Sequence, residues 1–276
     1  GPENGLSAEA VSAIVWDRFG TPWVGMEQHG LSRWNGFPKW QSWRMRDGLS
    51  NDEAMSFARD SAGRLWVGTR NGLNRKRADG GYDVFRKKNG LAEDEVRALV
   101  ATADGAVWAG SNEGGLTRIG ADGRMTRYGA REGLRNNRVV SLLAEATGEL
   151  WVSTRGGLYV GDWGAGEVRF TWYATPLTEG EQTMYRVLRA RDGSLWVGNT
   201  EGLARRHQGE WRRYGAADGL RVPGVVFATE RTAGELWVGY TGVAGVARLR
   251  VDPKGTIRSV MHYGRGAGLQ SDDISF

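Results

Sequence analysis

A tryptophan recurs along this chain about every 43 residues, and each copy stands three residues after a glycine. A Gly-Leu or Gly-Val pair follows each tryptophan, and a further aromatic residue closes each unit. Because six copies are far more than chance would give, they predict a repeat protein whose units pack on their neighbours. The six tryptophans are Trp23, Trp66, Trp108, Trp151, Trp196 and Trp237, at steps of 43, 42, 43, 45 and 41 residues.

Within each unit the apolar residues alternate with a period of two, which is typical of strands. Tight turns rich in glycine and aspartate separate the short apolar runs. Four strands per unit of this length indicate a β-propeller blade, so we expect an all-β chain. The predicted fold is a β-propeller of six four-stranded repeats, with strands near residues 11–17, 64–69 and 149–153 recurring at the same step. A six-bladed ring is favoured, and an incomplete seven-bladed propeller is the alternative.

The repeated residues are predicted to build the frame of the fold. Each central tryptophan would fill the space between two blades, and the glycine before it would form a turn that needs a positive φ. Five units also carry an arginine two residues after the Leu or Val of the later pair. We expect these arginines to lie along a blade and to meet carboxylates or carbonyls. They are Arg33, Arg75, Arg118, Arg205 and Arg248.

One domain is predicted to occupy nearly the whole chain of 276 residues. Residues 1–4 are interpreted as a tag remnant and N-terminal extension. Residues 5–276 are interpreted as a single propeller of six repeats. The tail "GLQSDDISF" aligns with "GLSAEAVSA" near the start, so the chain is expected to end at the start of a seventh repeat.

Composition and motifs give little support for catalysis. The chain has no cysteine, which excludes thiolate chemistry in it, and its three histidines, His29, His207 and His262, show no ligand spacing. No cofactor, metal site or catalytic residue is predicted. The carboxylate pairs Asp52-Glu53, Asp94-Glu95 and Asp272-Asp273 recur at one register, which favours a structural loop role. The net charge of +5 is spread over all units, so no nucleic-acid partner is expected.

Phrases such as "LWVGTRNGL", "LWVGNTEGL" and "DGLSNDEAMSFARDSAGRLWVG" resemble the two-component regulator propeller repeat. The resemblance covers all six units. It implies the periplasmic sensor part of a bacterial inner-membrane signalling protein, such as a hybrid histidine kinase, with a separate output domain. That family usually has seven blades per ring, from which six units depart. It has no shared catalytic motif, so the resemblance implies no active-site residue and no direct membrane insertion of this segment.

A ligand face is predicted where the loops vary most between units. The loops between the second and third strands differ in each unit, and they share one end of the blades with the crossings to the next unit. Their polar groups suit a small polar ligand such as an oligosaccharide, or a partner protein. A homodimer of the full-length protein could complete the site. The candidate ligand-binding residues are Glu27, His29, Arg70, Asn71, Asn112, Glu113, Arg155, Asn199, Glu201 and Tyr240.

Arg70 and Arg155 occupy equivalent positions two units apart and could clamp an acidic group. Two other functions stay open at this point. One is a propeller lyase acting on a polysaccharide or lactone, and the other is a structural propeller that only docks proteins. The scattered histidines argue against the lyase, which would need a base converging with other groups.

Overall fold

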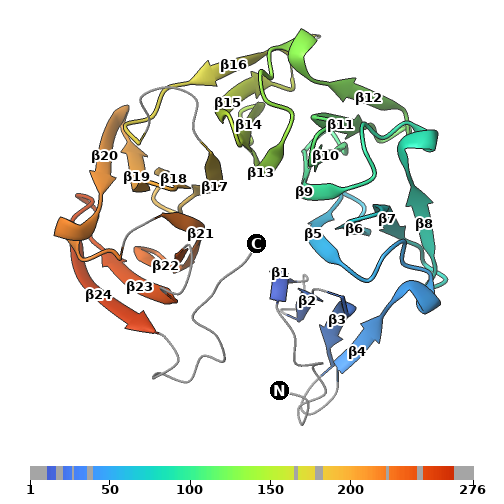
Figure 1. Cartoon of the computed structure of the whole chain (residues 1–276), viewed down its shortest axis with the longest axis horizontal. Coiled ribbons are helices and arrows are strands. Elements are labelled where there is room, and N and C mark those ends of the chain that lie inside the picture. The colour runs from blue at the N-terminus through green and yellow to red at the C-terminus, as the bar shows by residue number, and fades with distance from the viewer. Residues whose placement is uncertain are drawn as a thin grey trace. The chain divides into compact units, whose positions relative to one another are not determined.

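The computed structural model describes residues 11–16, 21–26, 28–35, 40–164, 167–177, 183–221, 224–240 and 245–263. In these ranges the chain forms six four-stranded antiparallel sheets, each from four consecutive strands (Figure 1). The helical segments among these residues are 3-10 turns of three residues. The predicted all-β propeller of six four-stranded blades is therefore confirmed, and each sheet is called a blade below.

Contacts between Cα atoms divide the chain into two compact units, residues 1–149 and 150–276. The strands of blades 1 to 3, in chain order, are β1 (Val11–Trp16), β2 (Pro22–Met26), β3 (Gly30–Trp34), β4 (Trp40–Trp43), β5 (Ala54–Arg59), β6 (Leu65–Thr69), β7 (Gly72–Lys76), β8 (Tyr82–Phe85), β9 (Val96–Ala101), β10 (Val107–Ser111), β11 (Leu116–Ile119) and β12 (Met125–Tyr128). The strands of blades 4 to 6 are β13 (Val139–Ala144), β14 (Glu149–Thr154), β15 (Gly157–Asp162), β16 (Phe170–Tyr173), β17 (Met184–Arg189), β18 (Leu195–Asn199), β19 (Gly202–His207), β20 (Glu210–Tyr214), β21 (Val225–Thr232), β22 (Glu235–Tyr240), β23 (Val246–Val251) and β24 (Ile257–Tyr263).

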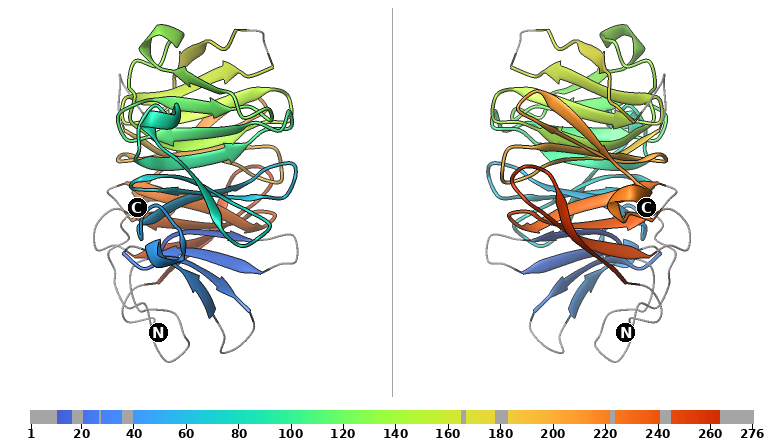
Figure 2. Two further views of the ribbon diagram at one scale, coloured as in Figure 1. Left: turned by 90° about the vertical axis from the view of Figure 1, so that its right-hand side faces the viewer. Right: turned by 90° about the vertical axis from the view of Figure 1, so that its left-hand side faces the viewer.

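In the first unit the blades pack face to face, and their first strands β1, β5, β9 and β13 contact one another in that order. Figure 2 shows these sheets, coloured blue to green, as stacked layers. Alternate residues of a strand face opposite sides of the sheet. The second strand of a blade therefore packs on both neighbouring blades, and each such blade-to-blade contact is called a junction below. Leu65 and Val67 of β6 pack with Trp23 of blade 1. Trp66 between them packs with Val107 of blade 3.

The repeated tryptophans are buried as predicted. Trp66, Trp151 and Trp196 are each 2% exposed, and Trp108 is completely buried. In the second unit Trp196 of blade 5 shares a core with Leu236 of blade 6. The late aromatic residue of each unit packs on the repeated tryptophan of the same unit. In blade 2 the rings of Trp66 and Phe85 are stacked, with 5.7 Å between their centroids. The tryptophans therefore fill blade junctions and hold the outer strand.

Two glycine positions show why the pattern needs glycine. Gly63 has φ +77° in the turn between β5 and β6, and its N–H donates to the carbonyl of Asp60 at 2.8 Å. Gly72 has φ +133° at the start of β7, where a Cβ would meet the carbonyl oxygen of Phe85 at 3.0 Å. The first confirms the predicted turn, and the second lets β7 start against its neighbour.

The five recurrent arginines lie along their blades. Arg75 donates to Asp83 at 2.7 Å, Arg118 to Asp104 at 2.5 Å and Arg205 to Asp192 at 2.7 Å. The guanidinium group of Arg33 lies 5.5 Å from the centroid of the Trp23 ring. That of Arg248 reaches the sulfur of Met261 at 3.8 Å. The predicted contact with a carboxylate is confirmed in three units, whereas Arg33 lies on a ring and Arg248 reaches a sulfur instead.

Candidate functional site

One end of each blade carries the turn between its second and third strands, together with the crossing to the next blade. In the first unit these segments are tied together by backbone hydrogen bonds. The N–H of Gly72 donates to the carbonyl of Asp94 at 2.7 Å. The N–H groups of Arg70 and Asn112 each reach a glutamate carbonyl, Glu53 and Glu95 respectively, at 3.2 Å. The predicted ligand face is therefore held by the main chain.

The aspartates of the recurring carboxylate pairs shape the crossings. Asp52 accepts the backbone N–H of Met45 at 2.6 Å, and Asp94 accepts that of Lys87 at 2.5 Å. Both N–H groups start a 3-10 turn, η2 (Met45–Asp47) and η3 (Lys87–Asn89), whose donors need such partners. The predicted structural role is confirmed for these two aspartates. Asp272 and Asp273 lie outside the described residues.

Arg70 is exposed on this end but has a partner within its own blade. Its guanidinium group lies 3.1 Å from a carboxylate oxygen of Glu53, and 63% of the arginine side chain is accessible. The hydrogen bond and the charge of Glu53, with the charge of Glu95, raise the pKa of Arg70. Asn71 is exposed beside it, and its carbonyl accepts a hydrogen bond from Arg86 at 3.2 Å. The structure thus places Arg70, Asn71 and Glu53 together.

The other predicted residues differ in accessibility. Glu113 is exposed, and its backbone N–H donates to the carboxylate of Glu93 at 2.5 Å, while Asn112 is half-buried. Arg155 and Glu201 are exposed in the second unit. His29 is half-buried in the turn before β3, and Glu27 lies outside the described residues. Arg70 and Arg155 belong to different compact units, so the predicted clamp stays a prediction.

Asn199 and Tyr240 are buried completely. The side-chain amide oxygen Oδ1 of Asn199 accepts the backbone N–H of Glu201 at 2.8 Å, which closes the turn between β18 and β19. Tyr240 packs 5.9 Å from the ring of His262, and burial raises the pKa of its hydroxyl. Asn199 thus supports a turn of this end, and Tyr240 packs against the outer strand of its own blade.

The sequence did not indicate a cavity at the opposite end of blades 1 and 2. It has a volume of about 700 Å³ and is lined by the turn before β6 and the turn after β7. Trp23 and Trp43, stacked at 5.2 Å between centroids, line the blade 1 side. Among the described residues that line it, six are basic and one is acidic: Arg33, Arg59, Arg64, Arg75, Lys76 and Arg77 against Asp83.

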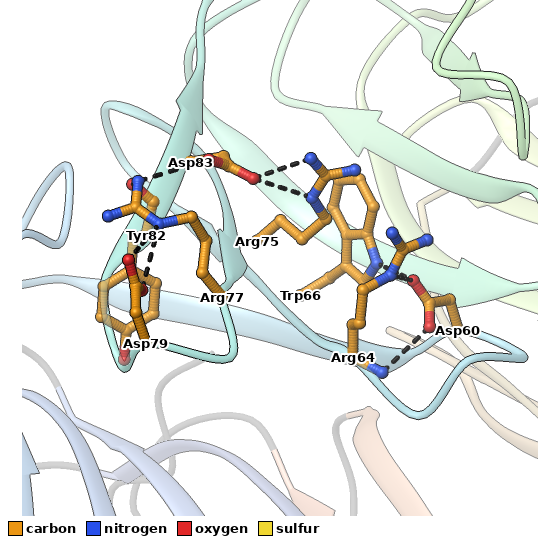
Figure 3. A network of polar contacts seen from close by, with 8 residues as sticks. All are labelled: Asp60, Arg64, Trp66, Arg75, Arg77, Asp79, Tyr82 and Asp83. Carbon is orange, nitrogen blue, oxygen red and sulfur yellow. Dashed lines mark hydrogen bonds and ion pairs between the residues drawn. The ribbon is translucent and has the colours of Figure 1, made fainter.

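A network of ion pairs holds the blade 2 side of this cavity (Figure 3). Asp83 lies between Arg75, at 2.7 Å, and Arg77, at 3.4 Å. Hydrogen bonds from Arg75 lead the effects that lower the pKa of Asp83. Arg77 also meets Asp79 at 3.1 Å. The carboxylate of Asp83 is therefore already neutralised by two arginines.

A second part of the network lies at the turn before β6 and involves Trp66. Asp60 accepts hydrogen bonds from the Trp66 indole at 2.8 Å and from the Arg64 guanidinium at 2.7 Å. Burial opposes the ionisation of Asp60, but these hydrogen bonds outweigh it and lower its pKa. The repeated tryptophan is thus fixed at its polar edge as well as by packing.

Neither end shows the parts of a metal centre or of a membrane span in the described ranges. No three histidine, aspartate or glutamate side chains there come together as metal ligands. None of the helices found in those ranges is long and apolar enough to cross a bilayer.

The fold defines the class of protein, a β-propeller of four-stranded blades. A profile of the family described as "Two component regulator propeller" matches residues 48–71. That segment runs from Gly48 through β5 and β6 to Asn71, so the predicted resemblance of the repeat is confirmed. No curated protein matches the chain.

Solved structures share the fold. An extracellular domain of a candidate one-component system from B. thetaiotaomicron is 19% identical, with a TM-score of 0.76 over 95% of this chain. One from a candidate hybrid two-component system of the same organism is 17% identical, with a TM-score of 0.77 over 100% of this chain. This chain spans 38% and 37% of those two proteins. A virginiamycin B lyase from Staphylococcus aureus is 16% identical, with a TM-score of 0.75 over 96% of this chain and 88% of the lyase.

Proposed function

We propose that this chain is a non-catalytic recognition domain of a bacterial membrane signalling protein and acts in the periplasm. The observation that carries the proposal is the match of residues 48–71 to the two-component regulator propeller family. Two structural neighbours, named as extracellular domains of such signalling systems, support the same location and role. The similarity to a lyase is one of fold, and a fold alone does not carry an activity.

The ligand is proposed to bind at the end that carries Arg70, Asn71 and Glu113. The frame residues repeat from blade to blade and are buried, whereas the exposed turn residues at this end differ between blades. A common frame with variable loops is the arrangement that specific binding proteins use. Exposed guanidinium, amide and carboxylate groups favour a small polar ligand such as an oligosaccharide, or a polar partner protein.

The test is a screen of glycans and metabolites by thermal shift, because a ligand that binds the native state raises the unfolding temperature. For a hit, we expect Arg70→Ala or Arg155→Ala to remove most of the shift. Arg124→Ala is the matched control, since Arg124 is exposed at the other end of blade 3. A hit that tolerates both changes would refute the site. Turnover of the hit would refute the non-catalytic role.

A further inference from the structure

One position of the third strand meets the preceding blade in blades 2, 3, 5 and 6, and its residue differs between them. It is the fourth residue after the glycine that starts the third strand. In blade 3 this residue is Ile119, which is 3% exposed and packs in the core that contains Trp66 and contacts Phe85 of blade 2. In blade 6 it is Leu249, which is completely buried in the core that contains Trp196. An apolar side chain thus closes each of these two junctions. In blade 5 the residue at this position is Arg206, whose guanidinium group lies 5.7 Å from the ring centroid of Tyr173 in blade 4.

In blade 2 the same position holds Lys76. Its ammonium nitrogen lies 4.2 Å from the ring centroid of Trp43 in blade 1 and 4.6 Å from that of Tyr82. A cation therefore takes the place of the apolar filler, at the junction where the cavity of about 700 Å³ is found. That volume is within the range of ordinary small-ligand sites.

Lys76 has only neutral partners among the described residues. Its ammonium group donates to the carbonyl of Gly80 and to the hydroxyl of Tyr82, each at 3.3 Å. Burial lowers its pKa. An ammonium group away from water is stabilised by an opposite charge, and in the described structure no carboxylate forms an ion pair with Lys76. An anion entering the cavity would supply that charge.

The aromatic rings of the cavity are already covered by cations. The guanidinium groups of Arg33 and Arg59 lie 5.5 and 5.6 Å from the centroid of Trp23, which is 6% exposed. Lys76 and Trp23 both lie on the ring of Trp43. The rings therefore offer little open face for stacking on a sugar. Guanidinium forks instead suit planar carboxylates, which they bind with two parallel hydrogen bonds.

We propose that the cavity between blades 1 and 2 is a second binding site, which takes a small ligand with two or more carboxylates. Among the described residues, the carboxylates of Asp60, Asp79 and Asp83 pair with three of the six basic side chains of the cavity, Arg64, Arg77 and Arg75, so the basic groups outnumber these carboxylates by three. One carboxylate alone would leave most of that excess uncompensated. The carboxylates can belong to a free polycarboxylic acid or to a short acidic peptide, and the experiment separates these two sources.

The test is isothermal titration calorimetry of the 276-residue chain in a buffer free of polyvalent anions. The probes are citrate and a blocked triglutamate peptide, and the neutral control is blocked triglutamine. We expect binding of citrate, of triglutamate or of both, no binding of triglutamine, and weaker binding as sodium chloride is added. The tighter of the two acidic probes identifies the source.

Substitutions then locate the site. Lys76→Met keeps the length of the side chain and should weaken binding by about tenfold or more. Lys76→Arg should retain it, and Lys88→Met, at an exposed lysine of η3, should leave it unchanged. Arg77→Gln, in the exposed turn after β7, should also weaken binding and is used if Lys76→Met does not fold. No binding of either acidic probe, or equal binding by the wild type and the two site variants, would overturn the proposal. Tighter binding of trigalacturonate than of both acidic probes would overturn it in favour of a sugar site.

Discussion

At the scale of single residues, the chain repeats one small assembly of side chains. A tryptophan packs against a late aromatic, and in blades 1, 2 and 5 an arginine also lies over its indole ring. In blade 2 an aspartate accepts a hydrogen bond from the indole as well. Residue spacing was enough to predict burial of the tryptophan and the structural role of the arginine. It was not enough to predict the partners, because Arg75 meets Asp83 across a strand pair whereas Arg118 meets Asp104 in a turn.

Trp151→Ala tests the role of the repeated tryptophan. Trp151 is 2% exposed and lies 4.8 Å from the ring of Tyr173. Loss of the buried indole should reduce the free energy of unfolding by about 3–5 kcal/mol, because the cavity left behind cannot collapse fully. The measurement is chemical unfolding, with Trp34→Ala as the control, since Trp34 is 39% exposed. Wild-type stability of the Trp151 variant would contradict the junction role.

At the scale of elements, strands and turns were predictable, but the crossings were not. Glycine and the period of two locate β6, β14 and their turns to within a residue or two of the structure. The 3-10 turns η2 and η3 depend on aspartates that accept N–H groups seven residues earlier in the chain, a contact that spacing alone does not reveal. The burial of Asn199 and Tyr240 could not be predicted either, because the loops that contain them look polar in sequence whether or not a given side chain is exposed.

Asp94→Ala tests the crossing between blades 2 and 3. The carboxylate of Asp94 accepts the backbone N–H of Lys87, and its loss leaves that donor to water. We expect the free energy of unfolding to fall by about 1 kcal/mol, as for the loss of a side-chain cap. Glu113→Ala, at an exposed position on the same end, should have little effect. If the two variants unfold at the same denaturant concentration, the aspartate has no capping role.

At the scale of the whole molecule, the number and type of blades were predictable because six units repeat one pattern. The cavity was not, because it depends on which side chains of successive blades meet. From the sequence alone Lys76 cannot be told from a surface lysine, because its contact with Trp43 of the preceding blade is seen only in the structure. The same holds for the predicted ligand end. Loop variation in the sequence was enough to nominate its candidate residues, but the structure was needed to show which of them are exposed.

Far-ultraviolet circular dichroism tests the fold of the intact chain. The described helices are 3-10 turns of three residues, so the spectrum should be that of a β protein with little helix. Tryptophan packing should also add bands that vanish together with the β signal on heating, since one set of junctions holds both. A spectrum dominated by helix would rule out the propeller.

The position held by Lys76, Ile119 and Leu249 has a consequence for how such proteins diversify. Its side chain is apolar in blades 3 and 6 and basic in blades 2 and 5, while the strands and turns on either side keep their roles. Each duplication of a unit creates another seam between blades, with its own copy of that position. Under our proposal that the seam at Lys76 binds a ligand, point mutation at this one position would change what a seam binds without altering the scaffold that carries it.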